Sequence, residues 1–191
     1  SVMFIGCAGN DEIQFPERPT PPAPPTPPSE FPLISTDPAF VTESMTEDVT
    51  IILNTAGTAA DGFSGELYAH TGVLTSESTT TGDWKYVKSE WGENIPECKL
   101  KSQGDNIWHY VIKGGPRAFY GVPEGETITH LAFVFRSADS KIEVKDNGAD
   151  IFVELATEGM SVKFLTPKNG QILTVGEECS VQVQQQEATK V

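Results

Sequence analysis

Residues 65–92 read GELYAHTGVLTSESTTTGDWKYVKSEWG and hold two of the three tryptophans of the chain. The first third of this stretch alternates like a β-strand, in which successive side chains point to opposite faces. One face is apolar apart from a threonine and predicts contact with a hydrophobic core: Leu67, Ala69, Thr71 and Val73. The other face carries Glu66, Tyr68, His70 and Gly72. The stretch therefore predicts a strand with one face in the core and a second face that the core does not need.

The second face of this strand places an aromatic ring beside an imidazole. Tyr68 and His70 together suit a flat, hydroxyl-rich ligand such as a sugar, because rings cover apolar faces and polar groups bond the rim. After a polar loop, Trp84 and Tyr86 share one face of a short predicted strand, and Trp91 follows. For Trp84, ligand stacking and core packing are equal alternatives, because large rings are well buried on average. A scaffold role is the alternative for His70.

The rest of the globular region predicts about eight short strands in all and no helical period. Besides the strand at 67–73, strands are expected at residues 47–54, 97–101, 106–112, 119–122, 127–135 and 150–155. In the first of these, Val49, Ile51 and Leu53 alternate with Asp48, Thr50 and Ile52. The sequence at 103–106, Gln-Gly-Asp-Asn, predicts a hairpin turn. The longest apolar run, TITHLAFVF at 127–135, predicts a central buried strand, and Trp108 is expected in the core. The expected fold class is an all-β sandwich over residues 36–157.

The acidic composition excludes some partners. The chain has 191 residues, with 27 acidic and 13 basic residues and a formal charge of −14. Such a chain is repelled by nucleic acid phosphates and by anionic membrane surfaces, so we expect neither as a partner. The three cysteines and three histidines lack the spacing of a metal site, so no metal or other cofactor is expected. Calcium binding by Asp146, Asn147 and Asp150 is the alternative to the tight turn that Asp-Asn-Gly usually forms.

The N-terminal residues carry a separate signal. The apolar run from Val2 to Ile5 ends at Gly6-Cys7, and residues 1–7 resemble the end of a bacterial lipoprotein signal peptide with Cys7 as the lipidated residue. The acidic residues that follow resemble the export signal of surface lipoproteins in the Bacteroidetes group. We therefore expect an outer membrane lipoprotein, exposed at the cell surface and attached by its lipid alone. An incidental apolar start is the alternative.

Two further segments flank the predicted sandwich. Residues 8–35 form a proline-rich linker, and proline, which fixes φ and lacks an amide donor, predicts a polyproline II stalk there. Residues 158–191 predict three strands, at 161–165, 171–175 and 179–183. The phrase FLTPKNGQILTVGEECSVQVQ resembles the first strands of immunoglobulin-like domains in bacterial surface proteins. We expect this part to begin such a domain, cut off at Val191.

Several motifs, taken in order, resemble a known family. Tyr68-Ala69-His70-Thr71-Gly72 precedes Trp84, and LAFVFR, Lys145-Asp146-Asn147-Gly148 and IFVEL follow. This order resembles the starch-binding carbohydrate-binding modules of bacterial amylases, and also the N-terminal region of Bacteroidetes surface lipoproteins of the α-amylase family. The resemblance implies α-glucan binding by Tyr68, His70, Trp84 and Trp91, with Lys145, Asp146 and Asn147 at the polar edge. Lys145 stands where these modules often carry tryptophan, and Trp91 is the candidate replacement.

No catalytic motif accompanies these residues. The chain has no Gly-x-Ser-x-Gly elbow, phosphate loop or dinucleotide fingerprint. We therefore expect non-catalytic α-glucan binding by part of a larger glycoside hydrolase, whose catalytic residues would follow Val191. One alternative is a purely binding lipoprotein of a starch-uptake system. Another is a cell-surface adhesive β domain without sugar affinity.

Overall fold

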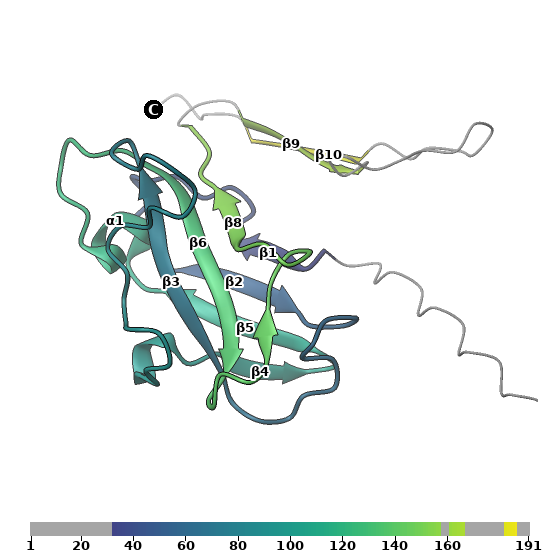
Figure 1. Ribbon diagram of the computed structural model, residues 1–191. Helices are drawn as coiled ribbons and strands as arrows, with labels where there is room; N and C mark the ends of the chain where they lie inside the picture. Colours follow the sequence, from purple (N-terminus) through teal and green to yellow (C-terminus); the bar gives the residue numbers. More distant parts are fainter. Residues whose placement is uncertain (1–31, 158–160, 167–181, 187–191) are drawn as a thin grey trace, which may run out of the picture.

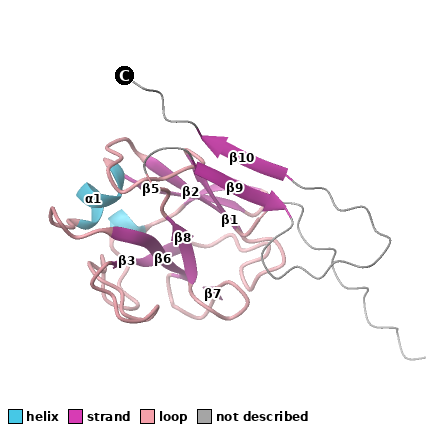
Figure 2. Ribbon diagram, turned by 90° about the horizontal axis from the view of Figure 1, so that it is seen from above, coloured by secondary structure: helices cyan, strands magenta, loops and turns pink. Residues whose placement is uncertain are grey.

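The computed structural model describes residues 32–157, 161–166 and 182–186, and residues 32–157 are built around two antiparallel sheets (Figures 1 and 2). The first sheet has the strand order β1 (Ile34–Asp37), β2 (Val49–Asn54), β5 (Ile107–Ile112) and β4 (Lys101–Gly104). The second sheet is built from β3 (Leu67–Thr75), β6 (Ile128–Ser137), β7 (Glu143–Val144) and β8 (Ile151–Glu154). The two sheets lie one over the other in Figure 1, which confirms the predicted all-β sandwich.

The core lies between the two sheets and is filled mainly by inward-facing side chains of β2, β3, β5 and β6, whereas all of β4 is exposed. In β2, Val49, Ile51 and Leu53 are fully buried, as their alternation predicted. In β5 the buried face includes Trp108, which confirms its predicted core position. The ring of Tyr110 meets that of Phe133 edge to face, with 6.2 Å between centroids. Because β5 and β6 belong to different sheets, this aromatic pair joins the two layers, in a geometry that aromatic rings prefer.

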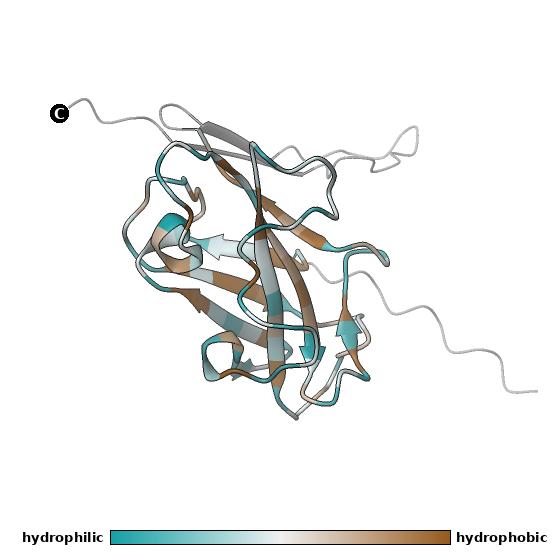
Figure 3. Ribbon diagram, turned by 60° about the vertical axis from the view of Figure 1, so that its left-hand side comes forward, coloured by the Kyte–Doolittle hydropathy of each residue, from teal (hydrophilic) through white to brown (hydrophobic). Residues whose placement is uncertain are grey.

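Strand β6 is the centre of the second sheet. It pairs with β3 along one edge and with β7 and β8 along the other. The predicted central strand at 127–135 is therefore confirmed. Hydrophobic segments are concentrated on the strands in Figure 3, as expected for strands that form the core. The predicted turn at 146–148 is also confirmed, since Asp146 and Ala149 exchange backbone hydrogen bonds across it.

The strand predicted at 119–122 is wrong. Residues Gly115–Tyr120 form a short helix, α1, with Pro116 in its first turn and Gly121 at its C-terminal end with φ 73°. Proline suits the first turn of a helix, and glycine adopts the left-handed conformation that ends one. The aromatic pair Phe119 and Tyr120 resembled a buried strand in the sequence, but the helix buries both rings instead.

Two other predicted strands also differ. The 97–101 prediction falls on a single 3₁₀ turn, η1 (Pro96–Cys98), and β4 begins only at Lys101. The short strand predicted at Trp84 and Tyr86 is absent among the strands of the described residues. Only Lys85 bridges to Val73 there, and Tyr86 takes a positive φ of 52° that no strand contains. The local turn at Tyr86 therefore prevents the regular alternation that the sequence suggested.

Residues 76–100, which we call the covering segment, return along β3. Lys85 and Val73 exchange two backbone hydrogen bonds, and the amide of Leu100 donates to the carbonyl of Leu67 at 2.9 Å. At Gly72 the covering segment also lies against the outer face of the sheet, because a Cβ there would lie 2.8 Å from the Lys85 carbonyl oxygen. The face of β3 that the sequence left free is therefore partly covered.

Outside the sandwich, β9 (Ser161–Thr166) and β10 (Gln182–Gln186) form an antiparallel pair. They overlap the strands predicted at 161–165 and 179–183. The strand predicted at 171–175 lies outside the described residues, as do Cys7 and nearly all of the predicted linker at 8–35. Within the described ranges, no helix has the length and apolar character needed to cross a membrane.

Candidate ligand-binding site

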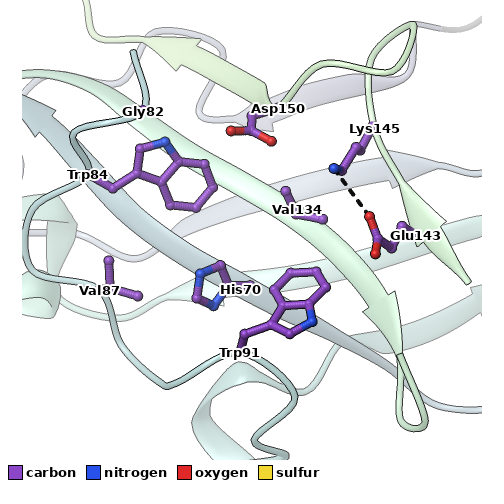
Figure 4. A pocket seen from close by; sticks show the side chains of 9 residues that line it. All are labelled: His70, Gly82, Trp84, Val87, Trp91, Val134, Glu143, Lys145 and Asp150. Carbon is purple, nitrogen blue, oxygen red and sulfur yellow. Dashed lines mark ion pairs between the residues drawn. The ribbon is translucent and has the colours of Figure 1, made fainter. Parts of the chain in front are cut away.

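A hollow of about 510 Å³ opens on the outer face of the second sheet (Figure 4). Its lining comes from strands β3, β6 and β7, from the connection between β7 and β8, and from the covering segment. The lining residues are His70, Gly82, Trp84, Val87, Trp91, Val134, Glu143, Lys145 and Asp150. His70 on β3 is the direct partner of Val134 on β6. Directly paired residues of antiparallel strands project to the same face, so these two side chains form the floor.

Aromatic rings form one side of the hollow. The imidazole of His70 stacks with the indole of Trp84, with 5.6 Å between centroids and 27° between planes. Trp91 meets the same imidazole edge to face at 5.2 Å. Figure 4 shows His70 between the two indoles. The hollow therefore presents two large rings at different orientations around one histidine.

The two indoles differ in their contacts and in their exposure to solvent. The Nε1 of Trp84 donates to the carbonyl of Thr81 at 3.0 Å, and its ring also meets Phe152 edge to face. Trp91 lies at the rim and is 47% exposed, the largest exposed fraction among the large hydrophobic side chains described. An aromatic ring of this size in water offers a site for apolar contact.

His70 is an uncharged element of the hollow. Burial lowers the pKa of His70, and the nearby charge of Arg136 lowers it further. Its Nδ1 is buried and has no hydrogen-bond partner among the described residues. An imidazole in this setting stays neutral at neutral pH, because charging it would place a cation in a poorly solvated site beside another cation.

Charged side chains form the opposite side of the hollow in Figure 4. The Nζ of Lys145 lies 3.2 Å from Oε2 of Glu143, so these two side chains are paired with each other. The carboxylate of Asp150 makes no hydrogen bond or ion pair with any described residue. Asp150 is therefore the carboxylate of the hollow with both oxygens open to hydrogen bonds from a ligand, whereas Glu143 shares its Oε2 with Lys145.

Four of the seven residues predicted to bind a ligand line this hollow: His70, Trp84, Trp91 and Lys145. Tyr68 does not line it, because its side chain is only 7% exposed and its hydroxyl donates to Glu66 at 2.9 Å. Asp146 and Asn147 also lie outside the lining and form the tight turn, in which Asn147 has a φ of 51°. The structure thus brings the tryptophans, His70 and Lys145 together, and Tyr68 lies outside this group, beside Arg136.

Several lining residues were missing from the predicted set. The sequence indicated Asp150 only as a calcium ligand, and it gave no indication for Glu143, Val87 or Val134. The alternation of the last strand holds a signal for Asp150, since Phe152, two residues later, meets Trp84 on the outer face. For calcium, the described residues contain no group of three or more His, Cys, Asp or Glu side chains arranged to hold a metal ion.

Comparisons with known proteins give no family assignment: no protein-family model matches the chain, and no curated protein matches it significantly. The chemistry of the hollow is then the guide to its ligand. Indole rings, a neutral imidazole and one uncommitted carboxylate suit a neutral molecule that has both apolar faces and hydroxyl groups. A polyanion would meet Asp150 and Glu143 in a chain of net charge −14.

Proposed function

We propose that this hollow binds an α-glucan without catalysis, as part of a surface lipoprotein glycoside hydrolase of the α-amylase family. The observation that carries the proposal is the pair of indoles, Trp84 and Trp91, set around His70 at the rim of an open hollow. The C–H faces of glucose units are apolar and stack on aromatic rings. Two rings at different orientations suit a curved chain of glucose units better than a flat one.

The polar side of the hollow supports the same ligand. Asp150 offers carboxylate oxygens to sugar hydroxyl groups, and charge-assisted hydrogen bonds of this kind are among the stronger ones in proteins. Lys145 lies across the hollow and provides a donor. The volume of about 510 Å³ falls within the range of roughly 300–1,000 Å³ found for small-molecule sites.

The arrangement of carboxylates favours binding over hydrolysis. Glycoside hydrolysis needs two carboxyl groups that act on opposite sides of the scissile bond. In the hollow Glu143 is paired with Lys145, and Asp150 alone is uncommitted among the described lining residues. We therefore place any catalytic step of the whole protein outside this site.

Titration calorimetry with maltoheptaose tests the proposal. Trp84→Ala and Trp91→Ala should each weaken binding by on the order of 1–3 kcal/mol, because each removes a ring that stacks on the sugar. The control is Val111→Ala on the first sheet, which removes an exposed hydrophobic side chain far in the fold from the hollow. Its affinity should equal that of the wild type.

Different results of the titration would support or reject different hypotheses. Folded Trp84→Ala and Trp91→Ala proteins with wild-type affinity would show that the hollow is not the site. A wild type that ignores maltoheptaose and every other polysaccharide tested would favour the adhesive domain without sugar affinity. Binding to another polysaccharide alone would keep the hollow as a sugar site and reject the α-glucan. A starch-uptake lipoprotein would use the hollow in the same way, and an assay of the complete gene product for α-glucan hydrolysis distinguishes it from a hydrolase.

A further inference from the structure

Arg136 is a buried charge next to the hollow that the ligand site itself does not use. It lies near the end of β6, where it pairs directly with Tyr68 on β3, and its side chain is only 1% exposed. A buried guanidinium is costly unless hydrogen bonds and neighbouring groups compensate for the lost water. The groups that bond to Arg136 therefore indicate which part of the structure this buried charge stabilises.

The hydrogen bonds of Arg136 clamp the covering segment just after Trp91. The Nη1 donates to Oδ1 of Asn94 at 2.8 Å, and the Nη2 donates to the carbonyl of Glu93 at 2.5 Å. Asn94 in turn donates from Nδ2 to the carbonyl of Ala138 at 2.9 Å. Residues 93–94 are thereby tied to the end of β6, two to three positions after Trp91.

The guanidinium also lies over two aromatic rings, those of Tyr68 and Trp91. Its central carbon lies 5.9 Å from the centroid of Trp91 and 5.7 Å from that of Tyr68. Both distances fall within the range of about 6 Å at which a cation is attracted to an aromatic face. One side chain therefore holds both the backbone after Trp91 and the indole of Trp91 itself.

We propose that Arg136 is the positioning residue that fixes Trp91 in its ligand-ready orientation. The link to ligand affinity rests on the proposed α-glucan site, whereas the effect on Trp91 itself does not. A half-exposed indole on a loop would otherwise be immobilised by the ligand, at an entropic cost that lowers affinity roughly two- to tenfold. Pre-ordering by Arg136 removes that cost from binding. Tyr68, predicted as a ligand contact, forms the other side of this support.

The choice of arginine follows from the geometry. The planar guanidinium donates to two acceptors of the covering segment while its face is open to the rings. A lysine ammonium is a point charge without a fixed fork, so it cannot reproduce both contacts. In the Arg136→Lys variant the charge is kept, but Trp91 should lose its wild-type orientation.

The test uses the full-length chain labelled with 5-fluorotryptophan and observed by fluorine NMR, together with maltoheptaose titration. Each of the three tryptophans gives one resonance, and Trp91→Phe assigns that of Trp91. The variants are Arg136→Met and Asn94→Ala. The matched control is Arg117→Met. Arg117 lies on α1, donates to the carbonyls of Pro123 and Glu126 and pairs with Glu43, so it is a comparable anchored arginine away from the hollow.

We expect Arg136→Met to shift or broaden the Trp91 resonance, leave that of Trp108 unchanged and weaken maltoheptaose binding roughly two- to tenfold. Asn94→Ala should produce the same changes to a smaller degree, and Arg117→Met should leave both the Trp91 resonance and the affinity unchanged. An unchanged Trp91 resonance in folded Arg136→Met overturns the proposal. If Arg136→Met does not fold, the same resonance in Asn94→Ala decides, and its invariance there overturns the proposal.

The two proposals fail in distinguishable ways. If the wild type does not bind maltoheptaose, the α-glucan proposal fails, yet the Trp91 resonance still reports on Arg136. If the wild type binds and the Trp91 resonance changes without loss of affinity, Arg136 orients Trp91 but the ligand does not depend on it. That result would overturn the positioning role in ligand binding.

Discussion

His70 illustrates how the surroundings of a single residue set its chemistry. Its imidazole stacks on the indole of Trp84 and meets that of Trp91 edge to face. The positive charge of Arg136 also acts on it. Burial is the larger cause of its lowered pKa, and the charge of Arg136 is the smaller one. A neutral ring continues the aromatic surface between the two indoles, whereas a charged ring would be strongly hydrated. His70 is therefore suited to a neutral ligand in its unprotonated form.

The lowered pKa of His70 predicts a pH dependence of stability. Because the folded pKa lies below the unfolded value of about 6.5, folding favours the neutral form. The stabilising contribution is complete above about pH 6.5 and is lost as the pH falls from there toward the folded pKa. Urea unfolding between about pH 7.5 and about pH 5 should therefore show a smaller loss of stability in His70→Gln than in the wild type.

A control separates this effect from the effect of a substitution as such. Val111→Ala alters a side chain on the first sheet, away from the hollow, keeps every titrating group and should keep the pH profile of the wild type. Parallel profiles for His70→Gln and the wild type would contradict the assignment of the effect to His70.

At the scale of elements, the covering segment decides which part of the second sheet stays accessible. It bonds to the backbone of β3 at Val73 and Leu67 and lies against the outer face at Gly72. The absence of a side chain at Gly72 lets the Lys85 carbonyl and Val87 approach the strand. Trp84 and Trp91 lie on either side of this contact in the chain, so both indoles depend on how closely the segment can pack.

Gly72→Ala tests this close approach. Its Cβ would lie 2.8 Å from the Lys85 carbonyl oxygen and 3.1 Å from Cγ2 of Val87, so the covering segment must shift. Overpacking of this kind costs about 1–3 kcal/mol, which should exceed the small gain from replacing glycine in a strand. Urea unfolding should show the lower stability.

Gly82→Ala provides the comparison. The nearest heavy atom to an added Cβ at Gly82 is Oγ1 of Thr80 at 3.9 Å, an ordinary contact distance. Its free energy of unfolding should stay close to that of the wild type. Equal stability of the Gly72→Ala and Gly82→Ala proteins would show that the covering segment accommodates the methyl group without strain.

At the scale of the whole molecule, the first sheet extends beyond the predicted start of the sandwich. The predicted module began at residue 36, whereas β1 begins at Ile34 and pairs Ile34 with Leu53 of β2. Leu33 adds a backbone hydrogen bond, since its carbonyl accepts from the amide of Asn54 at 2.9 Å. Both Leu33 and Ile34 pack against the core. The edge of the first sheet therefore depends on residues just outside the predicted boundary.

Two fragments test this boundary. Residues 32–157 should unfold cooperatively on heating and give a β-type circular dichroism spectrum, because they contain both sheets and the core. Residues 38–157 lack β1 and should be less stable by on the order of 2 kcal/mol, since two partly buried apolar side chains are lost. Equal melting temperatures for the two fragments would show that β1 contributes little. Absence of a transition in the longer fragment would show that the sandwich needs the flanking segments.

The amino-acid sequence by itself determined the β character of the chain and most of its core. The two-residue alternation placed Val49, Ile51 and Leu53 correctly, and a long apolar run marked β6, because a buried strand must match its side chains to the layers around it. The turn at Asp146-Asn147-Gly148 was also readable, since few residues accept positive φ. These features are local, and each depends on only a few neighbouring residues.

Only the tertiary structure decided which outward-facing residues meet. Alternation assigned Tyr68 and His70 to the same face, but it carries no information on what covers that face. The covering segment has no period, and its path depends on backbone contacts with β3 and on the Arg136 clamp. Asp150 is the residue immediately before β8. It lines the same hollow as His70 because β8 pairs with β6. Such contacts arise from the packing of distant segments, and so they appear only when the chain is folded.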